Sequence, residues 1–237
     1  LTLGTPWKAT SFITSPERLS SYFAQANYNF ERKYLLSLTY RADGSTKFAP
    51  GNQWGYFPAI SGAWVLTEEK FMAGQNLFSQ LKVRAAVGKS GNNRITDDMW
   101  RYQYEISASG GPGWGEANEN GFEYYINTGG KTLPNPSIKW ETTLTRNLAF
   151  DIGMFKDRLT ITPEVYWNTT TDLLYLSNIP TTTGYTQQMQ NIGQVTNRGF
   201  ELTINAQIIQ REKAYFNTTF TFGANKKRID KLNGTED

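Results

Sequence analysis

Apolar and polar residues alternate with a period of two through almost the whole of this 237-residue chain. Successive side chains of a β-strand point to opposite faces, so such a segment carries one apolar and one polar face. Eight segments alternate in this way: 22–30, 34–42, 59–66, 81–88, 143–154, 159–168, 199–208 and 216–223. Arg146 interrupts the apolar side of its segment, and Pro163, which lacks an N–H donor, predicts a bulge or local irregularity. The chain is therefore predicted to be all-β, with eight antiparallel strands.

The connections between these strands fall into two classes that alternate along the chain. Charged residues fill short turns at 31–33, 156–158 and 210–213, and 67–79 has the pattern of a helical turn. The connections at 43–56, 89–138 and 172–196 are long and rich in Gly, Asn, Pro, Trp and Tyr. In an antiparallel meander, alternate connections lie at opposite ends, so the short turns share one end and the long loops the other. This arrangement is typical of outer-membrane β-barrels, whose long loops are extracellular.

The composition excludes several classes of function. The chain has no Cys and no His, and its 24 basic residues nearly balance its 21 acidic ones. Thiolate and imidazole catalysis, disulfides and the usual zinc ligands are excluded, and we expect no metal site and no cofactor. A net charge of +3 is too small and too dispersed for a nucleic-acid-binding surface. The chain contains no run of 18 apolar residues, so its sequence predicts no transmembrane helix.

Two architectures fit the alternation. In a membrane barrel the apolar faces meet lipid, whereas in a soluble β-sheet adhesin or carbohydrate-binding module they pack against each other. Strands of about nine to eleven residues match the span of a tilted membrane strand. Aromatic residues near the strand ends, among them Tyr28, Tyr34 and Trp64, fit the aromatic girdles of a barrel. Both observations favour the barrel; a closed eight-stranded barrel is disfavoured by the length of the 89–138 loop.

Longer strings of the sequence resemble one known family. Residues 34–64 read YLLSLTYRADGSTKFAPGNQWGYFPAISGAW. Further blocks follow in order: LKVRAAVGKSGNN at 81–93, NPSIKWET at 135–142, NIGQVTNRGFEL at 191–202 and NKKRIDKL at 225–232. These strings resemble those of SusC/RagA-like TonB-dependent outer-membrane transporters, and together they cover nearly the whole chain.

The resemblance implies a fold and a function. The expected fold is an antiparallel transmembrane barrel of 22 strands closed by a plug, of which this chain supplies about eight strands, with the plug and the N-terminal domains outside it. The implied function is active import of oligosaccharides or peptides across the outer membrane of a Bacteroidetes-like bacterium, and not catalysis. The implied partners are a SusD-like surface lipoprotein, TonB acting through regions outside this chain, the transported glycan or peptide, and outer-membrane lipid.

Two groups of side chains are candidate contact sites. If the polar faces border a hydrated lumen, the charged residues expected there are Arg41, Arg84, Asp151, Glu164 and Glu201. The long loops offer aromatic rings beside amides, a mixture that holds sugars and peptides; these rings are Trp114, Phe122, Tyr124, Tyr125 and Tyr185. Packing of the same rings against other loops or the lipoprotein is an equal alternative. The two glutamates have a second interpretation: Glu164 and Glu201 could form the carboxylate pair of a glycosidase, which would depend on the distance between the two carboxylates.

Overall fold

Eight long strands dominate the computed structural model, which describes residues 17–102, 104–107, 125–128, 132–211, 214–232 and 235–236, with only the backbone at 104–107, 125–128 and 235–236. The strands are β1 (Leu19–Phe30), β2 (Tyr34–Ser45), β3 (Trp54–Val65), β4 (Phe78–Asn92), β8 (Glu141–Met154), β9 (Leu159–Thr171), β12 (Gln194–Arg211) and β13 (Ala214–Leu232). Each contains most or all of one predicted segment, and most extend beyond it. The prediction of eight strands is confirmed.

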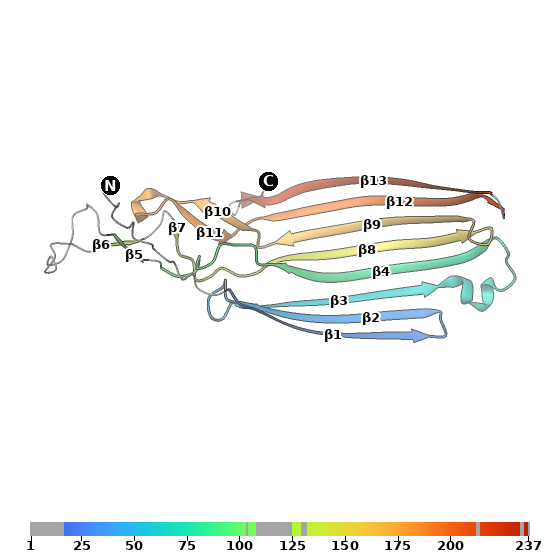
Figure 1. Ribbon diagram of the computed structural model, residues 1–237, viewed down its shortest axis with the longest axis horizontal. Helices are drawn as coiled ribbons and strands as arrows, with labels where there is room; N and C mark the ends of the chain where they lie inside the picture. Colours follow the sequence, from blue (N-terminus) through green and yellow to red (C-terminus); the bar gives the residue numbers. More distant parts are fainter. Residues whose placement is uncertain are drawn as a thin grey trace, which may run out of the picture.

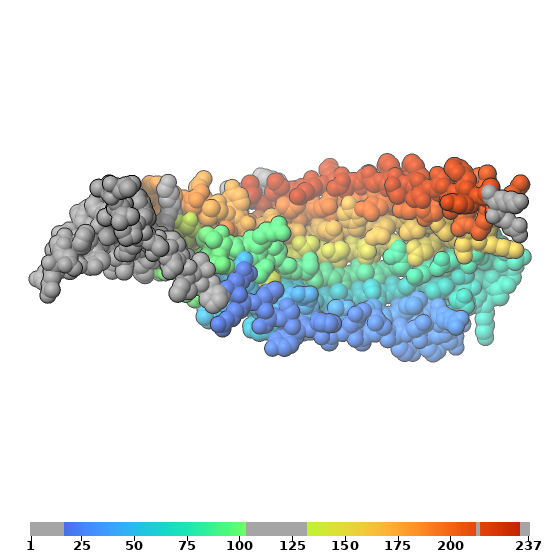
Figure 2. All heavy atoms as spheres, in the orientation of Figure 1, coloured from blue at the N-terminus to red at the C-terminus, as the bar shows by residue number. Residues whose placement is uncertain are grey.

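These strands form one sheet in the order β1-β2-β3-β4-β8-β9-β12-β13, and the short β14 (Thr235–Glu236) follows β13. Every neighbouring pair is antiparallel. Figure 1 shows the sheet as a curved array from β1 in blue to β13 in red, and Figure 2 shows the strands packed into one continuous surface. β1 is paired only with β2, so the described strands form part of a barrel and do not close on themselves.

The two ends of the sheet differ in their connections. The turns β1–β2 and β8–β9 lie at one end, together with the paired strand ends Arg211 of β12 and Ala214 of β13 and the 3₁₀ turns η1 (Leu66–Glu68) and η2 (Lys70–Met72) between β3 and β4 (Figure 1). We call this the turn end and the opposite one the loop end. The tight turns use the left-handed conformation at charged residues, for example Glu31 (φ 51) and Arg32 (φ 58), and this backbone twist suits a two-stranded hairpin.

The connections at the loop end carry small sheets of their own. β10 (Leu174–Asn178) pairs with β11 (Gln187–Asn191), which runs parallel to β7 (Thr132–Leu133); the 3₁₀ turn η3 (Thr181–Thr183) lies between β10 and β11. β5 (Tyr104–Ser107) pairs with β6 (Tyr125–Thr128). The long strands extend beyond the predicted segments, so the bounds of the connections differ from those predicted. They are 46–53, 93–140 and 172–193, where the sequence predicts 43–56, 89–138 and 172–196.

The strand register aligns the apolar residues into rows that cross the sheet on one face. One such row runs through Leu36, Gly62, Ala85, Leu148, Val165 and Phe200, each paired with the next. Within the described residues no second sheet is stacked on the long strands, and Leu38 (44% exposed) and Phe150 (39%) remain open on this face. A soluble sandwich would bury these side chains, so the sandwich alternative does not fit the structure.

Two bands of stacked aromatic rings bound the apolar face. At the turn end, Tyr28, Phe30, Tyr34 and Trp64 form a chain in which successive ring centroids lie 6.4 Å apart. Near the loop end, Tyr22 stacks on Trp54 at 5.9 Å and Tyr40 on Tyr56 at 6.3 Å. The strand between Tyr22 and Phe30 covers about 26 Å at about 3.3 Å per residue, or about 20 Å along the membrane normal at a tilt of about 40°. This matches an apolar band of about 25 Å between two aromatic girdles.

Pro163 causes an irregularity without a bulge. β9 keeps its register with β12 through the Leu202–Pro163 pair. On the other side, pairing with β8 stops after Ala149–Glu164 and resumes at Ile152–Ile161 in the same register. The missing N–H donor therefore opens the ladder locally, and the predicted irregularity is confirmed.

Among the described residues, no helix has the length and apolar character needed to cross a membrane.

Candidate functional site: a polar wall below a loop cluster

The face opposite the apolar rows carries a network of ionic and amide groups in the middle of the sheet. Arg84 of β4 forms a bidentate pair with Asp151 of β8, with Nε–Oδ2 at 2.8 Å and Nη2–Oδ1 at 3.0 Å. Lys82 Nζ lies 3.7 Å from the same carboxylate. The three side chains retain 38%, 22% and 25% exposure for Arg84, Asp151 and Lys82. A partly hydrated surface explains how three charges stand together on one sheet face at little desolvation cost.

Two carboxylates continue this network toward β12. Asn147 of β8 donates from Nδ2 to Glu164 Oε1 at 3.0 Å. Glu201 is the direct cross-strand partner of Glu164 and lies exposed. Directly opposed like charges are unfavourable unless water or a cation screens them. The geometry therefore fits a hydrated wall, and the described residues contain no group of three or more acidic side chains that could hold a metal ion.

Amide, hydroxyl and small apolar side chains line two hollows on this polar face. One hollow of about 500 Å³ is bordered by Asn27, Asn29 and Arg84, and an adjoining one of about 310 Å³ by Thr39 and Ser90. Both hollows also touch a shared set: Ser37, Ser61, Ala86 and Asn147. Apart from Arg84 and Lys89, the polar groups in these hollows donate and accept hydrogen bonds without a fixed charge, so they suit contact with polar, uncharged groups of a solute.

Arg41 and Asp43 stand nearer the loop end on β2. Arg41 Nε donates to both carboxylate oxygens of Asp43, at 2.9 and 2.8 Å. Asp43 is buried and Arg41 half-exposed. The neighbouring Ser45 is also buried, and its hydroxyl accepts from Asn93 Nδ2 at 3.2 Å and from the Lys47 amide at 3.3 Å. This polar group ties the end of β2 to the chain that leaves β4.

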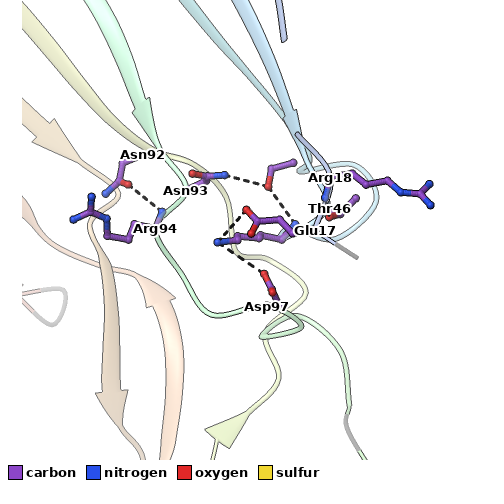
Figure 3. Close-up of polar contacts among 9 residues, drawn as sticks. Glu17, Arg18, Thr46, Asn92, Asn93, Arg94 and Asp97 are labelled. Atoms are coloured by element: carbon purple, nitrogen blue, oxygen red, sulfur yellow. Dashed lines mark hydrogen bonds and ion pairs between the residues drawn. The ribbon is translucent and has the colours of Figure 1, made fainter. Parts of the chain in front are cut away.

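An ion triad reinforces the same junction. Lys47 Nζ lies 3.2 Å from Glu17 and 3.8 Å from Asp97, so one amine joins the segment before β1 to the loop after β4. Figure 3 shows Glu17 and Asp97 approaching from these different segments, with Arg18 and Thr46 beside them. The Arg18 amide donates to Thr46 Oγ1 at 3.0 Å.

A compact hydrophobic cluster forms the base of the loop end. Its buried members are Phe48, Phe57, Ile95, Ile138 and Trp140, and Phe48 and Ile138 are fully buried. The centroid of the Trp140 ring lies 5.3 Å from that of Phe48 and 5.5 Å from that of Phe57, which it meets edge-on. Its indole N–H donates to the Gln53 carbonyl at 2.9 Å. We call this the loop cluster; it is the best-buried hydrophobic core in the described chain.

Two asparagines connect the loop cluster to the hairpin of β10 and β11. Asn191 exchanges hydrogen bonds with the backbone of Lys139 and also donates to the Asp172 carbonyl, at 2.8 to 2.9 Å. Asn135 Nδ2 donates to the Met189 carbonyl at 2.8 Å. The blocks NPSIKWET and NIGQVTNRGFEL therefore meet in space, although they lie far apart in the sequence.

The structure tests the candidate residues only in part. Arg84 forms an ion pair with Asp151, and Glu164 binds Asn147 on the same face with Glu201 opposite it, whereas Arg41 stands apart with Asp43. Trp114, Phe122, Tyr124 and the side chain of Tyr125 lie outside the described residues. Tyr185 lies partly exposed between η3 and β11, where its amide donates to Thr183 Oγ1 at 3.3 Å.

Sequence reasoning missed the loop cluster. Its signal was present, because Phe48, Ile138 and Trp140 are isolated apolar residues inside polar connections and belong to the strings that carry the family resemblance. Sequence reasoning also placed Glu69 in the helical turn at 67–79 and assigned no contact to its carboxylate. In the structure, its carboxylate accepts from Tyr34 Oη at 2.6 Å and Trp64 Nε1 at 3.1 Å and so holds the aromatic band at the turn end.

Comparisons with known proteins agree with this geometry. Residues 2–236 match the family model described as "TonB dependent receptor-like, beta-barrel". The chain is 35% identical over 225 residues to the TonB-dependent receptor SusC of Bacteroides thetaiotaomicron, covering 92% of this chain and 21% of that protein. It is 37% identical over 214 residues to a TonB-dependent receptor of Formosa agariphila, covering 90% and 20%. The chain thus spans about a fifth of the curated relatives it matches.

Solved structures give the same result for the fold. The RagAB peptide importer in its 'open-open' state superposes with a TM-score of 0.79 at 25% identity, covering 92% of this chain and 22% of that one. The siderophore receptor PirA from Pseudomonas aeruginosa superposes with a TM-score of 0.54 at 15% identity, covering 90% and 35%. At that identity the second match shows the fold alone.

Proposed function

Because this chain belongs to the TonB dependent receptor-like β-barrel family of outer-membrane proteins, we propose that it forms part of the wall and of the outer mouth of a SusC/RagA-like importer. The whole protein would bind an oligosaccharide or a peptide at the loop end and carry it along the polar face of the sheet. The observation that carries this proposal is the two-sided sheet: a lipid-matched apolar face between two aromatic bands, and a hydrated, amide-lined face behind it.

The loop end is the outer mouth in this proposal. Long loops of outer-membrane barrels are extracellular and their short turns periplasmic. The loop cluster fixes the bases of the connections 46–53 and 93–140, and the Asn191 hydrogen bonds fix β10 and β11 beside them. A rigid base of this kind supports longer loops that contact the solute or a surface lipoprotein of the SusD type.

The proposed energy source and partner rest on the relatives. The relatives are named TonB-dependent receptors, so we propose that TonB drives import through parts of the protein outside this chain. The RagAB peptide importer is a structural neighbour, and peptides are therefore one substrate class to test. Oligosaccharides are the other, because aromatic rings beside amides in the loops suit sugar binding.

The test uses the full-length gene and its own bacterium. Deletion should abolish uptake of one class of fluorescent probe, either a labelled oligopeptide mixture or a labelled oligosaccharide mixture, and loss of TonB should abolish the same uptake. Complementation with the full-length gene should restore it. Unchanged uptake of both probe classes in the deletion strain would refute the import proposal.

The location has a separate test. The purified full-length protein should partition into the detergent phase and should migrate differently on electrophoresis before and after heating, as folded outer-membrane barrels do. A protein that stays in the aqueous phase and shows no heat-modified mobility would contradict the barrel.

A further inference from the structure

A row of cations crosses the apolar face near the loop end. Arg146 on β8, Trp167 on β9, Arg198 on β12 and Lys226 on β13 are consecutive cross-strand partners. They share this face with the apolar row that contains Leu148. The sequence marks Arg146 as a single misfit, whereas the register makes it one of three aligned cations. We call Arg146, Arg198 and Lys226 the cation row.

The cation row has no internal counter-charge. Within the described part of the chain, no carboxylate pairs with any of its three members, and all three are exposed. The acidic residues of β8, β9 and β12 lie on the polar face, and Asp230 of β13 binds Thr196 and Arg228. Arg198 and Lys226 are direct cross-strand neighbours of like charge, an arrangement that is unfavourable unless water or an anion screens the two charges.

Lys226, at one end of the cation row, lies at the level expected for lipid headgroups. On β13 the apolar face runs from Phe216 to Lys226, which spans about 33 Å of strand and about 25 Å along the membrane normal at a tilt of about 40°. The hydrocarbon-facing band of a barrel is about 25 Å tall, so Lys226 reaches its outer border. Trp167, which is 45% exposed and lies between Arg146 and Arg198, occupies the position of a girdle aromatic.

The surface around the row is hollowed on a scale that admits a headgroup and an acyl chain. A groove of about 410 Å³ lies over β9, β12 and β13, and Trp167, Arg198 and Lys226 line it around the small residues Gly199 and Ala224. A second hollow of about 510 Å³ on the apolar face is lined by Ala24, Ala26, Leu38, Ile60, Val87 and others. Val87 is the cross-strand partner of Arg146, so the apolar hollow adjoins one end of the cation row.

We propose that the cation row and its groove bind the phosphate of an anionic lipid in the outer leaflet of the membrane that holds the barrel. Arginine offers several N–H donors to phosphate oxygens, lysine offers a compact positive charge, and both gain from the low dielectric at the lipid surface. The lipid's acyl chains would lie on the apolar rows below. The inference rests on the proposed orientation, with the loop end outward.

The experiment titrates the purified full-length transporter in a neutral detergent with dioleoylphosphatidylglycerol and, in parallel, with zwitterionic dioleoylphosphatidylcholine, and counts bound lipids by native mass spectrometry. Removal of one cation from the membrane surface should weaken binding of an anionic lipid about fivefold. We therefore expect the wild-type protein to retain the anionic lipid preferentially. Lys226→Gln should lose about fivefold in affinity for it and Arg198→Gln/Lys226→Gln about 30-fold.

The chain supplies a matched control. Lys227 adjoins Lys226 but points to the opposite face, where it pairs with Asn197 in the register. Lys227→Gln removes the same charge and should leave lipid binding unchanged, and Arg198→Lys should keep most of it. Equal retention of the two lipids by the wild-type protein, or equal losses in Lys226→Gln and Lys227→Gln, would overturn the proposal. Displacement of the lipid by an equal concentration of inorganic phosphate would assign the groove to a free anion and would overturn it as well.

The import proposal and the lipid proposal fail separately. Uptake of the labelled peptides or oligosaccharides is measured on the same variants in cells. Selective lipid binding by a protein that imports neither probe would overturn only the import proposal. Import without lipid selectivity would overturn only the lipid proposal.

Discussion

Gly91 is the position at which the loop cluster is most sensitive to one added methyl group. The Phe57 ring enters the space beside β4 just beyond the last cross-strand pair of β3 and β4, Ala59–Gly88. A Cβ at position 91 would stand 2.0 Å from Phe57 Cζ and 2.4 Å from Cε1. The φ of Gly91 lies outside the left-handed range, so an alanine is sterically allowed by the backbone. Gly91→Ala therefore isolates the contact with the ring.

The expected destabilisation is about 2 kcal/mol. Ordinary carbon contacts lie at about 3.5–4.0 Å, so the tip of the ring must move by about 1.5–2 Å. Overpacking of this kind costs about 1–3 kcal/mol, and loss of the edge contact between Phe57 and Trp140 adds about 0.5–1.5 kcal/mol. Alanine loses less backbone conformational entropy on folding than glycine does, and this difference offsets about 0.5–1 kcal/mol of the destabilisation.

Hydrogen exchange of the full-length transporter in detergent measures this effect where it arises. Amides in 46–53 and 93–102 should lose protection on the order of 10- to 100-fold in Gly91→Ala. Gly62→Ala is the matched control, because a Cβ there meets only the Leu35 carbonyl at 3.9 Å; protection should be unchanged. Phe57→Leu combined with Gly91→Ala should recover part of the loss. Equal protection in the two glycine variants would refute the reasoning.

Three further changes have expected outcomes. Glu69 accepts hydrogen bonds from two girdle aromatics, which lowers the pKa of its carboxyl below the ordinary 4.5. Its contribution to stability is therefore complete above pH 4.5 and is lost as the pH falls through the lowered pKa. Thermal unfolding of Glu69→Gln should differ from wild type at pH 7, and the difference should shrink as the pH is lowered below 4.5. Asp151→Asn leaves Arg84 without its bidentate partner and should cost about 1 kcal/mol in urea unfolding, since both side chains are partly hydrated; an unchanged midpoint would contradict this. Asn191→Ala removes three hydrogen bonds to backbone groups, two of them at Lys139, and should cost about 2–3 kcal/mol, measured as faster amide exchange in 172–193; unaltered exchange there would show that water replaces the side chain.

The long strands were accessible from the sequence because a membrane sheet obeys a simple local rule. Leu148 and Phe150 meet lipid while Asn147 and Asp151 meet water, and this contrast repeats at every second residue. The strand ends were less accessible, because beyond the lipid-facing segment the alternation no longer has to be apolar against polar. β13 illustrates this: it continues through the charged block at 225–232, which carries no apolar repeat.

The arrangement of the site depended on long-range pairing that no local pattern contains. That Arg84 belongs with Asp151 follows from the register of β4 and β8, two strands separated by the longest connection in the chain. The same holds for Asn191 and Lys139, which meet across 52 residues of sequence. The alternation predicts that Arg84, Glu164 and Glu201 lie on the polar face. Only the register shows that Glu164 and Glu201 are direct cross-strand partners.

The strings that carry the family resemblance have a structural reason for their composition. Phe48, Phe57 and Trp140 come from two of these strings and meet in the loop cluster, while Asn135 and Asn191 bind backbone groups of other connections. These side chains are consumed by packing and by main-chain hydrogen bonds, so they are not free to recognise a solute. In the import proposal, recognition of the solute is therefore assigned to the amides and hydroxyls of the polar wall and to the loops above the cluster. On this proposal the scaffold and the contact surface are built from separate residues, so a substitution in the polar wall should change solute contacts without disturbing the loop cluster.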